Sequence, residues 1–331
     1  MISPSAAALA TGSAAAVAGA RKPMPMALRI ALRLGLTGLL LSLILLAVPL
    51  HEVVEAARAA SLRPLLGGFA LGFLFAALKI VRWRWLLVRM GVACGMLEAT
   101  RSYFGGMAVG LITPGRLGEV ARGMYIDYRD KTYAGSVAFV DKLFDIAVLV
   151  VAAAAGWALY GFYEIAVLMF LGAAGLVACL FLPSRIVTSV ARRLPVRGIR
   201  VHLEKAAAPL DRATLSTVSG ALIQAVLSFL VAATQFWLFL LAFGPAPLGA
   251  AFLAMPMIVL ANLIPITISG IGVREWAAIV LLSQYSVPGA VAVSVAMLGF
   301  VSNTLGPGIT GALLAPRWKR LPTGLAVEAS R

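Results

Sequence analysis

The chain contains 331 residues, of which 61% are hydrophobic and only 12% are charged, and its mean hydropathy is +0.97. A typical soluble domain is about 45–50% apolar and about 25% charged, so this composition excludes a soluble globular protein and leaves no room for a separate soluble catalytic domain. The formal net charge of +15 predicts basic loops beside anionic lipid headgroups. Nucleic acid is not an expected partner, because no basic domain with interleaved aromatic residues is present.

Six long apolar stretches follow one another along the chain, each long enough to cross a hydrocarbon core as a helix. A core of about 30 Å requires roughly 20 apolar residues per helix. We therefore predict an all-α polytopic membrane protein with about six full spans, whose membrane domain covers 27–316 between a disordered cytoplasmic tail at 1–26 and a cytoplasmic tail at 317–331. The predicted spans are 30–50, 64–87, 136–157, 166–182, 216–243 and 288–315.

Two further apolar stretches are interrupted near their middle by glycine, proline and charged residues. The first, 103–126, is broken at Thr113-Pro114-Gly115-Arg116, and the second, 248–284, is broken at Pro265 and again at 269–272. Non-helical chain at membrane depth is tolerated only where it is buried in protein or lines a wet cavity. The two stretches are therefore predicted to be broken or re-entrant helical segments that border a cavity.

Basic residues in short loops predict the orientation, because they remain on the cytoplasmic side. Basic clusters at 21–33, 82–101, 185–212 and 317–320 place both termini in the cytoplasm. If 103–126 crossed the membrane completely, the cluster at 185–212 would fall outside, so this segment is expected to enter and leave on the cytoplasmic face. By the same count the second broken segment begins and ends outside, either as a re-entrant pair or as two short spans.

The two broken segments share an order of residue types. In the first, Arg116, Glu119 and Arg122 follow the break at spacings of three, which places neighbours on one side of a short helix. In the second, glycines are followed by Arg274 and Glu275 at the start of an apolar helix. One such segment in each half, entered from opposite faces, is typical of an inverted repeat, and half-helix N-termini of this kind often hold anionic groups.

A third charged group lies within the predicted span 136–157. Asp141 and Asp145 share a helix face, with Lys142 beside them. Charges within a span usually face a partner or a cavity. We expect the two carboxylates to pair with the arginines of the first broken segment, while Lys142 and Arg274 supply positive charge for a phosphate. The alternative is that these residues lie at headgroup level and anchor the helix.

The remaining polar residues carry weaker signals. Among the intramembrane amides, Asn262 is the best candidate for substrate contact because it lies close to the second break, whereas Gln235 and Asn303 are expected to bond between helices. The run at 82–85, Arg-Trp-Arg-Trp, is interpreted as an interfacial belt. The few, isolated cysteines and histidines predict no metal site and no cofactor.

Four motifs give the chain a resemblance to a known family. They are 78–84 (LKIVRWR), 114–119 (PGRLGE), 141–145 (DKLFD) and 270–275 (GIGVRE). The sequence resembles the flippase-like membrane domain of lysylphosphatidylglycerol synthetases and of stand-alone bacterial relatives. The resemblance covers about 30–315 and implies a lipid-translocating fold in the bacterial inner (plasma) membrane. The family usually has Glu-Arg followed by Asp at the third motif, where this chain has Asp-Lys, and a proline before the glycines of the fourth, where it has Ile268-Ser269.

The expected function is movement of a lipid with an anionic headgroup across the membrane. The expected substrate-binding residues are Arg116, Glu119, Arg122, Asp141, Lys142, Asp145, Asn262, Arg274 and Glu275. The synthetase members carry an additional soluble aminoacyl-transfer domain, whereas this sequence ends at Arg331, so it is not expected to be an enzyme. The alternative is a non-transporting accessory protein that binds lipid or a lipid-synthesis enzyme. A homo-oligomer or such an enzyme is the expected protein partner.

Overall fold

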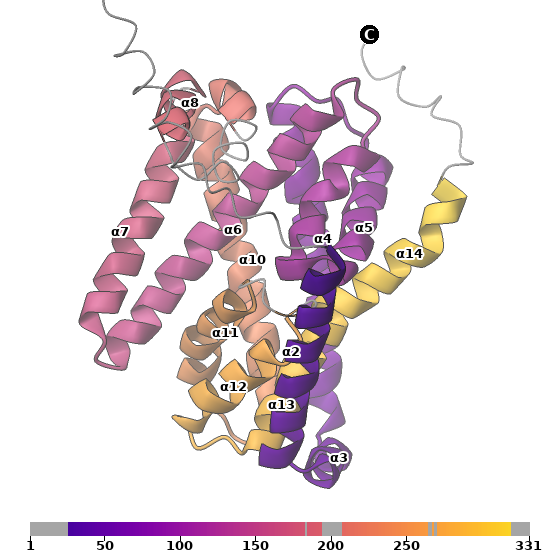
Figure 1. The fold of residues 1–331 in the computed structure, drawn as a ribbon, viewed down its shortest axis with the longest axis vertical. Coiled ribbons are helices and arrows are strands. Elements are labelled where there is room, and N and C mark those ends of the chain that lie inside the picture. The colour runs from indigo at the N-terminus through magenta and orange to yellow at the C-terminus, as the bar shows by residue number, and fades with distance from the viewer. Residues whose placement is uncertain (1–25, 183, 194–206, 264–266, 268–269, 319–331) are drawn as a thin grey trace, which may run out of the picture.

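The computed structural model describes residues 26–182, 184–193, 207–263, 267 and 270–318 (Figure 1). These residues form helices joined by short turns, and this part of the chain contains no strand. The predicted tails at 1–26 and 317–331 lie almost entirely outside the described residues. The predicted all-α class is confirmed.

The helices follow one another in an order close to the one expected from the sequence. The first half contains α2 (Met26–Ala47), α3 (Leu50–Ala59), α4 (Leu62–Arg89), α5 (Met96–Ile112), η1 (Pro114–Tyr125), α6 (Lys131–Leu159), α7 (Tyr163–Leu180) and α8 (Ser184–Arg193). The second half contains η2 (Ala208–Arg212), α10 (Leu215–Leu241), η3 (Ala250–Ala254), α11 (Met255–Asn262), α12 (Val273–Ser283), α13 (Gly289–Phe300), η4 (Val301–Leu305) and α14 (Gly306–Trp318).

The number of full spans differs from the six that the sequence predicts. Among the described residues, four helices are long and apolar enough to cross a membrane, namely Leu62–Arg89, Tyr163–Leu180, Leu215–Leu241 and Gly289–Leu314. A fifth is present if α2 and α3, which meet at a bend of 70°, count as one span. The count of six is therefore not confirmed. The first predicted span differs because Pro49 lies at the bend and has no backbone N–H to continue the helix.

Among the described residues, two large hydrophobic clusters form most of the core, and α10 contributes to both, while a smaller third cluster joins Ile44 and Val48 to Ala290 and Val293 of α13. The first cluster joins α10 to α4, α5 and α6 through residues such as Leu86 and Phe144, and the second joins it to α11, α12 and α13 through residues such as Phe239 and Ile258. Close approach of α4 to α10 depends on Gly68, where a Cβ atom would lie 2.4 Å from the Phe239 ring. Small residues permit such contacts between membrane helices.

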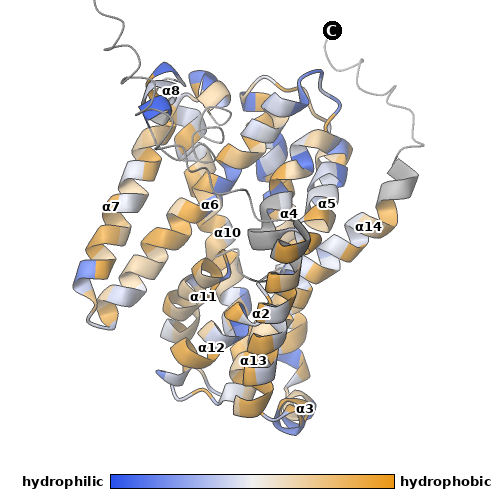
Figure 2. Cartoon of the chain, viewed as in Figure 1, coloured by the Kyte–Doolittle hydropathy of each residue, from blue (hydrophilic) through white to orange (hydrophobic). Residues whose placement is uncertain are grey.

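The outer surface carries large apolar side chains over the middle of the molecule. On α7, for example, Leu168 is 72% exposed and Leu171 is 62% exposed. Figure 2 shows hydrophobic residues along the helices and hydrophilic residues concentrated toward the ends of the molecule, above all at α8. A surface of this kind is stable against lipid chains rather than water.

The first broken segment folds back on itself as an antiparallel pair, α5 and η1. Glycines of α5 allow the approach: Cβ atoms at Gly105, Gly106 and Gly110 would lie 2.6–3.1 Å from side chains of Tyr125, Arg122 and Glu119, respectively. The chain therefore returns toward the end of the molecule from which it entered. The break falls at Thr113, as predicted, and the short helix that follows is a 3-10 helix.

The second broken segment consists of η3 with α11, followed by α12. The helical stretch Ala250–Asn262 has 13 residues and α12 has 11, so at about 1.5 Å per residue neither crosses a core of about 30 Å. This geometry favours a re-entrant pair over two short spans. In Figure 1, α11 and α12 lie toward the opposite end of the molecule from α5, in agreement with the inverted-repeat hypothesis, which stays a prediction.

The turn before α12 is built from two glycines with positive φ, Gly270 (74°) and Gly272 (90°). At Gly270 a Cβ atom would lie 1.3 Å from Oδ1 of Asn262, so no larger residue fits. The Gly272 N–H donates a hydrogen bond to Oε2 of Glu275 at 2.7 Å, which satisfies one of the free N–H groups at the start of α12. Pro265 and Ser269, also predicted at this break, lie outside the described residues.

Candidate membrane-embedded cavity

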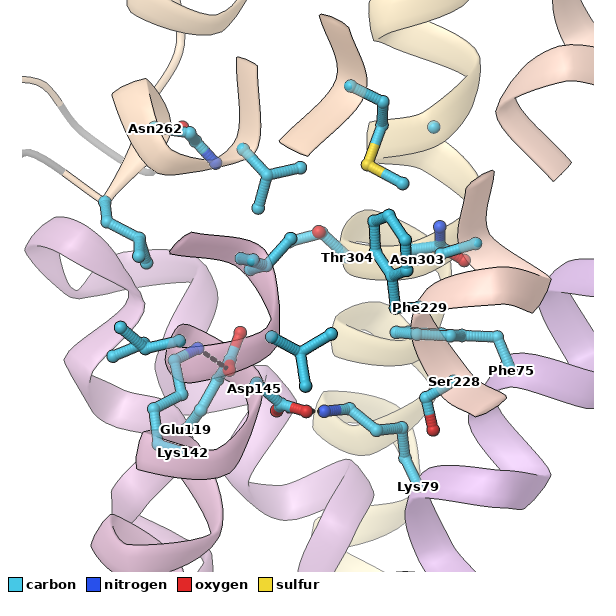
Figure 3. Close-up of a pocket in the computed structure, with 18 of the residues that line it drawn as sticks. Phe75, Lys79, Glu119, Lys142, Asp145, Ser228, Phe229, Asn262, Asn303 and Thr304 are labelled. Carbon is cyan, nitrogen blue, oxygen red and sulfur yellow. Dashed lines mark hydrogen bonds and ion pairs between the residues drawn. The ribbon is translucent and has the colours of Figure 1, made fainter. Parts of the chain in front are cut away.

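A cavity of about 210 Å³ lies between the two broken segments and the long helices (Figure 3). Its walls come from α4, α5, η1, α6, α10, α11, α12, α13 and η4. Seven of the nine predicted site residues line it: Glu119, Arg122, Asp141, Lys142, Asp145, Asn262 and Arg274. The folding of the chain thus brings together charged residues that are far apart in sequence.

Arg82 joins the two aspartates of α6. Its Nε lies 2.7 Å from Oδ1 of Asp141 and its Nη2 lies 2.7 Å from Oδ1 of Asp145, and its side chain is completely buried. The interpretation of Arg82 as part of an interfacial belt is therefore wrong, because a buried arginine needs carboxylate partners and finds them on α6. Lys79, which lies one turn before Arg82 on α4, pairs with Asp145. Lys79 and Arg82 are three residues apart and the aspartates four apart, so each pair lies on one face of its helix, and this was the signal in the sequence for the contact.

The 3-10 helix η1 is held against α6 by two further ion pairs. Arg122 pairs with Asp141, and Lys142 Nζ lies 2.6 Å from Oε2 of Glu119. A 3-10 helix has three residues per turn, so Glu119 and Arg122 project from the same side and both reach α6. The guanidinium of Arg122 also lies 4.2 Å from the centre of the Trp83 ring. The predicted pairing of the α6 carboxylates with an arginine of this segment is confirmed for Asp141 and Arg122.

The cations differ in how far they reach into the cavity. The side chains of Lys142 and Lys79 are 22% and 14% exposed, whereas Arg82 is fully buried and Arg122 is 9% exposed. Arg82 and Arg122 are clamped by carboxylates, and Arg122 by an aromatic ring as well. The two lysines are therefore the most exposed of these four cations, although each is also paired with a carboxylate.

Arg274 lies in the first turn of α12, directly after the second break. It pairs with Glu275 and lies 4.4 Å from the centre of the Phe300 ring. Arg274 lines the cavity, whereas Glu275 is buried behind it. Glu275 thus holds both the arginine and the backbone of Gly272, while its own side chain does not line the cavity.

An amide cluster occupies another part of the wall. Gln235 Nε2 donates to Oγ of Ser302 at 2.8 Å, and Asn303 Nδ2 donates to Oε1 of Gln235 at 2.7 Å. This confirms that Gln235 and Asn303 bond between helices, and both also line the cavity together with Thr304. Ser302, Asn303 and Thr304 lie in the π-helical turn η4, a widened turn that is frequent at functional sites.

Not every predicted site residue can be placed. The side chain of Arg116 lies outside the described residues, although its backbone belongs to η1. Lys79 and Arg82 were not among the predicted site residues, and the amides Gln235 and Asn303 were assigned to helix packing alone. Their participation depends on which helices meet around the cavity, and this cannot be read from one segment at a time.

Comparison with known proteins gives one clear result. The family described as the lysylphosphatidylglycerol synthase TM region matches residues 30–311, which include every residue of the cavity. No curated protein matches the chain. The match agrees with the resemblance seen in the four motifs and supports a membrane domain related to lipid handling. The chain is a polytopic membrane protein that belongs to the family of lysylphosphatidylglycerol synthase TM regions.

Proposed function

We propose that the protein moves a lipid with an anionic, phosphate-containing headgroup across the membrane, and that the cavity receives this headgroup. The observation that carries the proposal is the presence of two partly exposed lysines, Lys79 and Lys142, in a cavity enclosed by membrane helices. Ionisable residues are rare within membrane helices and often mark a substrate pathway, and both lysines, although paired with carboxylates, keep part of their surface open to the cavity. We propose transport rather than a chemical reaction on the lipid.

The charges around the cavity suit an anion. Four cations, Lys79, Arg82, Arg122 and Lys142, contact three carboxylates, those of Glu119, Asp141 and Asp145. Among the residues whose side chains the structure describes, this network has one positive charge in excess, which a phosphodiester would neutralise. The lysine ammonium group concentrates its charge at one atom, whereas an arginine guanidinium presents several N–H groups in one plane. A phosphate can therefore contact Lys142 without the two parallel hydrogen bonds that an arginine would form. The arginines keep the carboxylates in place while the lysines meet the ligand.

The proposed setting is the bacterial inner membrane, with both termini in the cytoplasm. The broken segments would then enter from opposite faces and place the cavity within the bilayer, as in transporters with discontinuous helices. An ion gradient, a lipid gradient or a partner would supply the driving force. A second copy of the chain or a lipid-synthesis enzyme is the proposed protein partner.

The test is translocation of fluorescent anionic, zwitterionic and cationic lipids in liposomes that contain the purified protein. The decisive variant replaces Glu119 and Lys142 together by glutamine, because it removes the cation without leaving a carboxylate unpaired. Flux of the anionic lipid should fall about tenfold or more, the change that about 1.4 kcal/mol of lost interaction produces. A Lys142→Arg variant should retain most of the flux, and Arg129→Gln, which removes an exposed cation outside the cavity, should behave as wild type.

The possible outcomes separate the two candidate functions. Normal flux in the Glu119→Gln/Lys142→Gln variant would mean that the pair is only structural and would contradict the proposal. Binding of anionic lipid by the wild type without any flux would favour the accessory function. Equal movement of all lipids in wild type and variant would indicate unspecific leakage.

A further inference from the structure

The cavity has two chemically different ends. Figure 3 shows Lys79, Glu119, Lys142 and Asp145 at one end and Asn262, Asn303 and Thr304 at the other, with apolar side chains between them. The charged end suits a phosphate. The amide end is not needed for phosphate binding. Its chemistry instead indicates which headgroup is attached to the phosphate of the ligand.

The distance between the two ends follows from α4. Gly72 lies beside the amide cluster, since a Cβ atom there would be 2.1 Å from Oγ of Ser302 and 2.8 Å from Nε2 of Gln235. Lys79, at the charged end, is two turns further along the same helix. Seven residues at about 1.5 Å each separate these positions by roughly 10 Å along the axis. Because side chains reach inward from both ends, the remaining space suits a headgroup of about the size of one sugar or polyol ring.

The amide end contains buried polar atoms without a protein partner. Oδ1 of Asn303 is buried and accepts no hydrogen bond within the described part of the chain. Oδ1 of Asn262 likewise has no partner there, but it lies against Gly270, so the Asn262 amide nitrogen is the atom that faces the cavity. Leaving such atoms unsatisfied is unfavourable. Hydroxyl groups of a ligand would donate to Oδ1 of Asn303 and accept from the Asn262 amide nitrogen, because a carboxamide and a hydroxyl each both donate and accept hydrogen bonds.

The amide end does not favour an amine. All carboxylates that line the cavity in the described residues, Glu119, Asp141 and Asp145, belong to the charged network, while Arg274 is the charged lining residue contributed by the second broken segment. An ammonium group beside Asn303 would find no carboxylate to neutralise it among these residues. Two amides and the hydroxyl of Thr304 instead match an uncharged, hydroxyl-rich group.

We propose that the ligand is a lipid phosphodiester whose headgroup continues into an uncharged polyol or sugar, which the amide end recognises through its hydroxyl groups. This inference rests on the proposed function, because the charged end must hold the phosphate. Asn262, Asn303 and Thr304 are the residues that determine headgroup specificity. Asn303 contributes most directly, because the widened turn η4 brings it and Thr304 to the cavity side by side.

The test compares short-chain phosphatidylinositol, phosphatidylmethanol and phosphatidylethanolamine by calorimetric binding to the full chain in detergent. The first two are phosphodiesters of equal charge and differ in the hydroxyls. Phosphatidylinositol should bind about tenfold more tightly than phosphatidylmethanol, as expected for one or two additional hydrogen bonds. Phosphatidylethanolamine should bind no more tightly than phosphatidylmethanol.

Two variants make the test specific to the amide end. Asn303→Leu should reduce the ratio of the two phosphodiester affinities to about one, and Asn303→Asp should shift the preference toward phosphatidylethanolamine. Because each readout is a ratio within one variant, partial loss of folding does not mimic the effect. Gln224→Leu is the matched control, since Gln224 bonds to Gly220 within its own helix and should leave the ratio at its wild-type value.

The failure of this inference differs from the failure of the proposed function. Equal binding of both phosphodiesters in the wild type, with both weakened by Glu119→Gln/Lys142→Gln, would overturn the headgroup inference and leave the proposed function standing. Tightest binding of phosphatidylethanolamine would also overturn it. Absence of binding by either phosphodiester would overturn both.

Discussion

Arg82 is the residue on which the ion-pair network depends, because it contacts carboxylates at two positions of α6 while fully buried. We expect Arg82→Met to destabilise the protein by about 3–5 kcal/mol, since it leaves two buried carboxylates short of a partner. The measurement is thermal unfolding of the detergent-solubilised protein. Arg82→Met combined with Asp145→Asn should recover part of the loss, and a change below about 1 kcal/mol in the single variant would contradict the buried network.

Cys94 provides a prediction about reactivity outside the membrane helices. The thiol lies in the turn between α4 and α5 and is 8% exposed, and burial raises the pKa of Cys94 to about 12. The thiolate is the reactive form, so at neutral pH almost none is present. In a Cys179→Ser background, Cys94 should not react with a maleimide until the protein is unfolded. Rapid labelling of the native protein at neutral pH would show that the turn is open.

At the scale of elements, the α5–η1 pair has a close contact at Gly118 in addition to those at Gly105, Gly106 and Gly110. A Cβ atom at Gly118 would lie 2.6 Å from the carbonyl oxygen of Val109 and 2.5 Å from Oγ1 of Thr113, which already accepts a hydrogen bond from Gly118 N–H at 2.7 Å. We expect Gly118→Ala to destabilise the protein by about 1–3 kcal/mol through overpacking. Thermal unfolding of the purified variant is the measurement.

A matched glycine exists for this comparison. Gly135 lies in α6 with no atom within 4 Å of its Cβ position, so Gly135→Ala should be neutral or should stabilise the helix by up to about 1 kcal/mol. Equal destabilisation by both substitutions would show that the tight contact at Gly118 is not what maintains the pair.

Both broken segments could be predicted from the sequence, because proline and glycine disrupt helices through local backbone chemistry. Thr113-Pro114 marked the first break and Gly270 and Gly272 marked the second, and the structure has both. The 3-10 form of η1 was not predicted, since it depends on packing against α5 and α6. Arg82 was misassigned for a related reason: a Trp-flanked arginine resembles an interfacial anchor until its partner, more than 60 residues away, is known.

At the scale of the whole molecule, the proposed topology predicts which loops face the cytoplasm. Arg129 lies in the exposed turn before α6, and Glu164 is exposed at the start of α7 near the other end of α6. In a cysteine-free background, Arg129→Cys should react with a membrane-impermeant maleimide only from the cytoplasmic side, and Glu164→Cys only from the outside. Position 129 is preferable to 130, because Asp130 caps α6 by accepting a hydrogen bond from the Tyr133 N–H at 3.0 Å.

Labelling of both cysteines from the same side would refute the arrangement in which α6 crosses between them. External labelling at 129 together with cytoplasmic labelling at 164 would show that the whole protein has the opposite orientation in the membrane. In that case the cavity described above would keep its geometry, but its charged end would lie near the other face.

The pairing of α4 with α6 also has a consequence for biosynthesis. Lys79 and Arg82 are made before Asp145, which follows 66 and 63 residues later. Each unpaired charge in a membrane helix opposes insertion by about 2.5–3.5 kcal/mol. We therefore expect insertion of α4 into lipid to be less favourable before α6 is present than after. Lys79 and Arg82 therefore gain these partners only after α6 has been made, and a chain that ended before Asp141 would leave both cations without them.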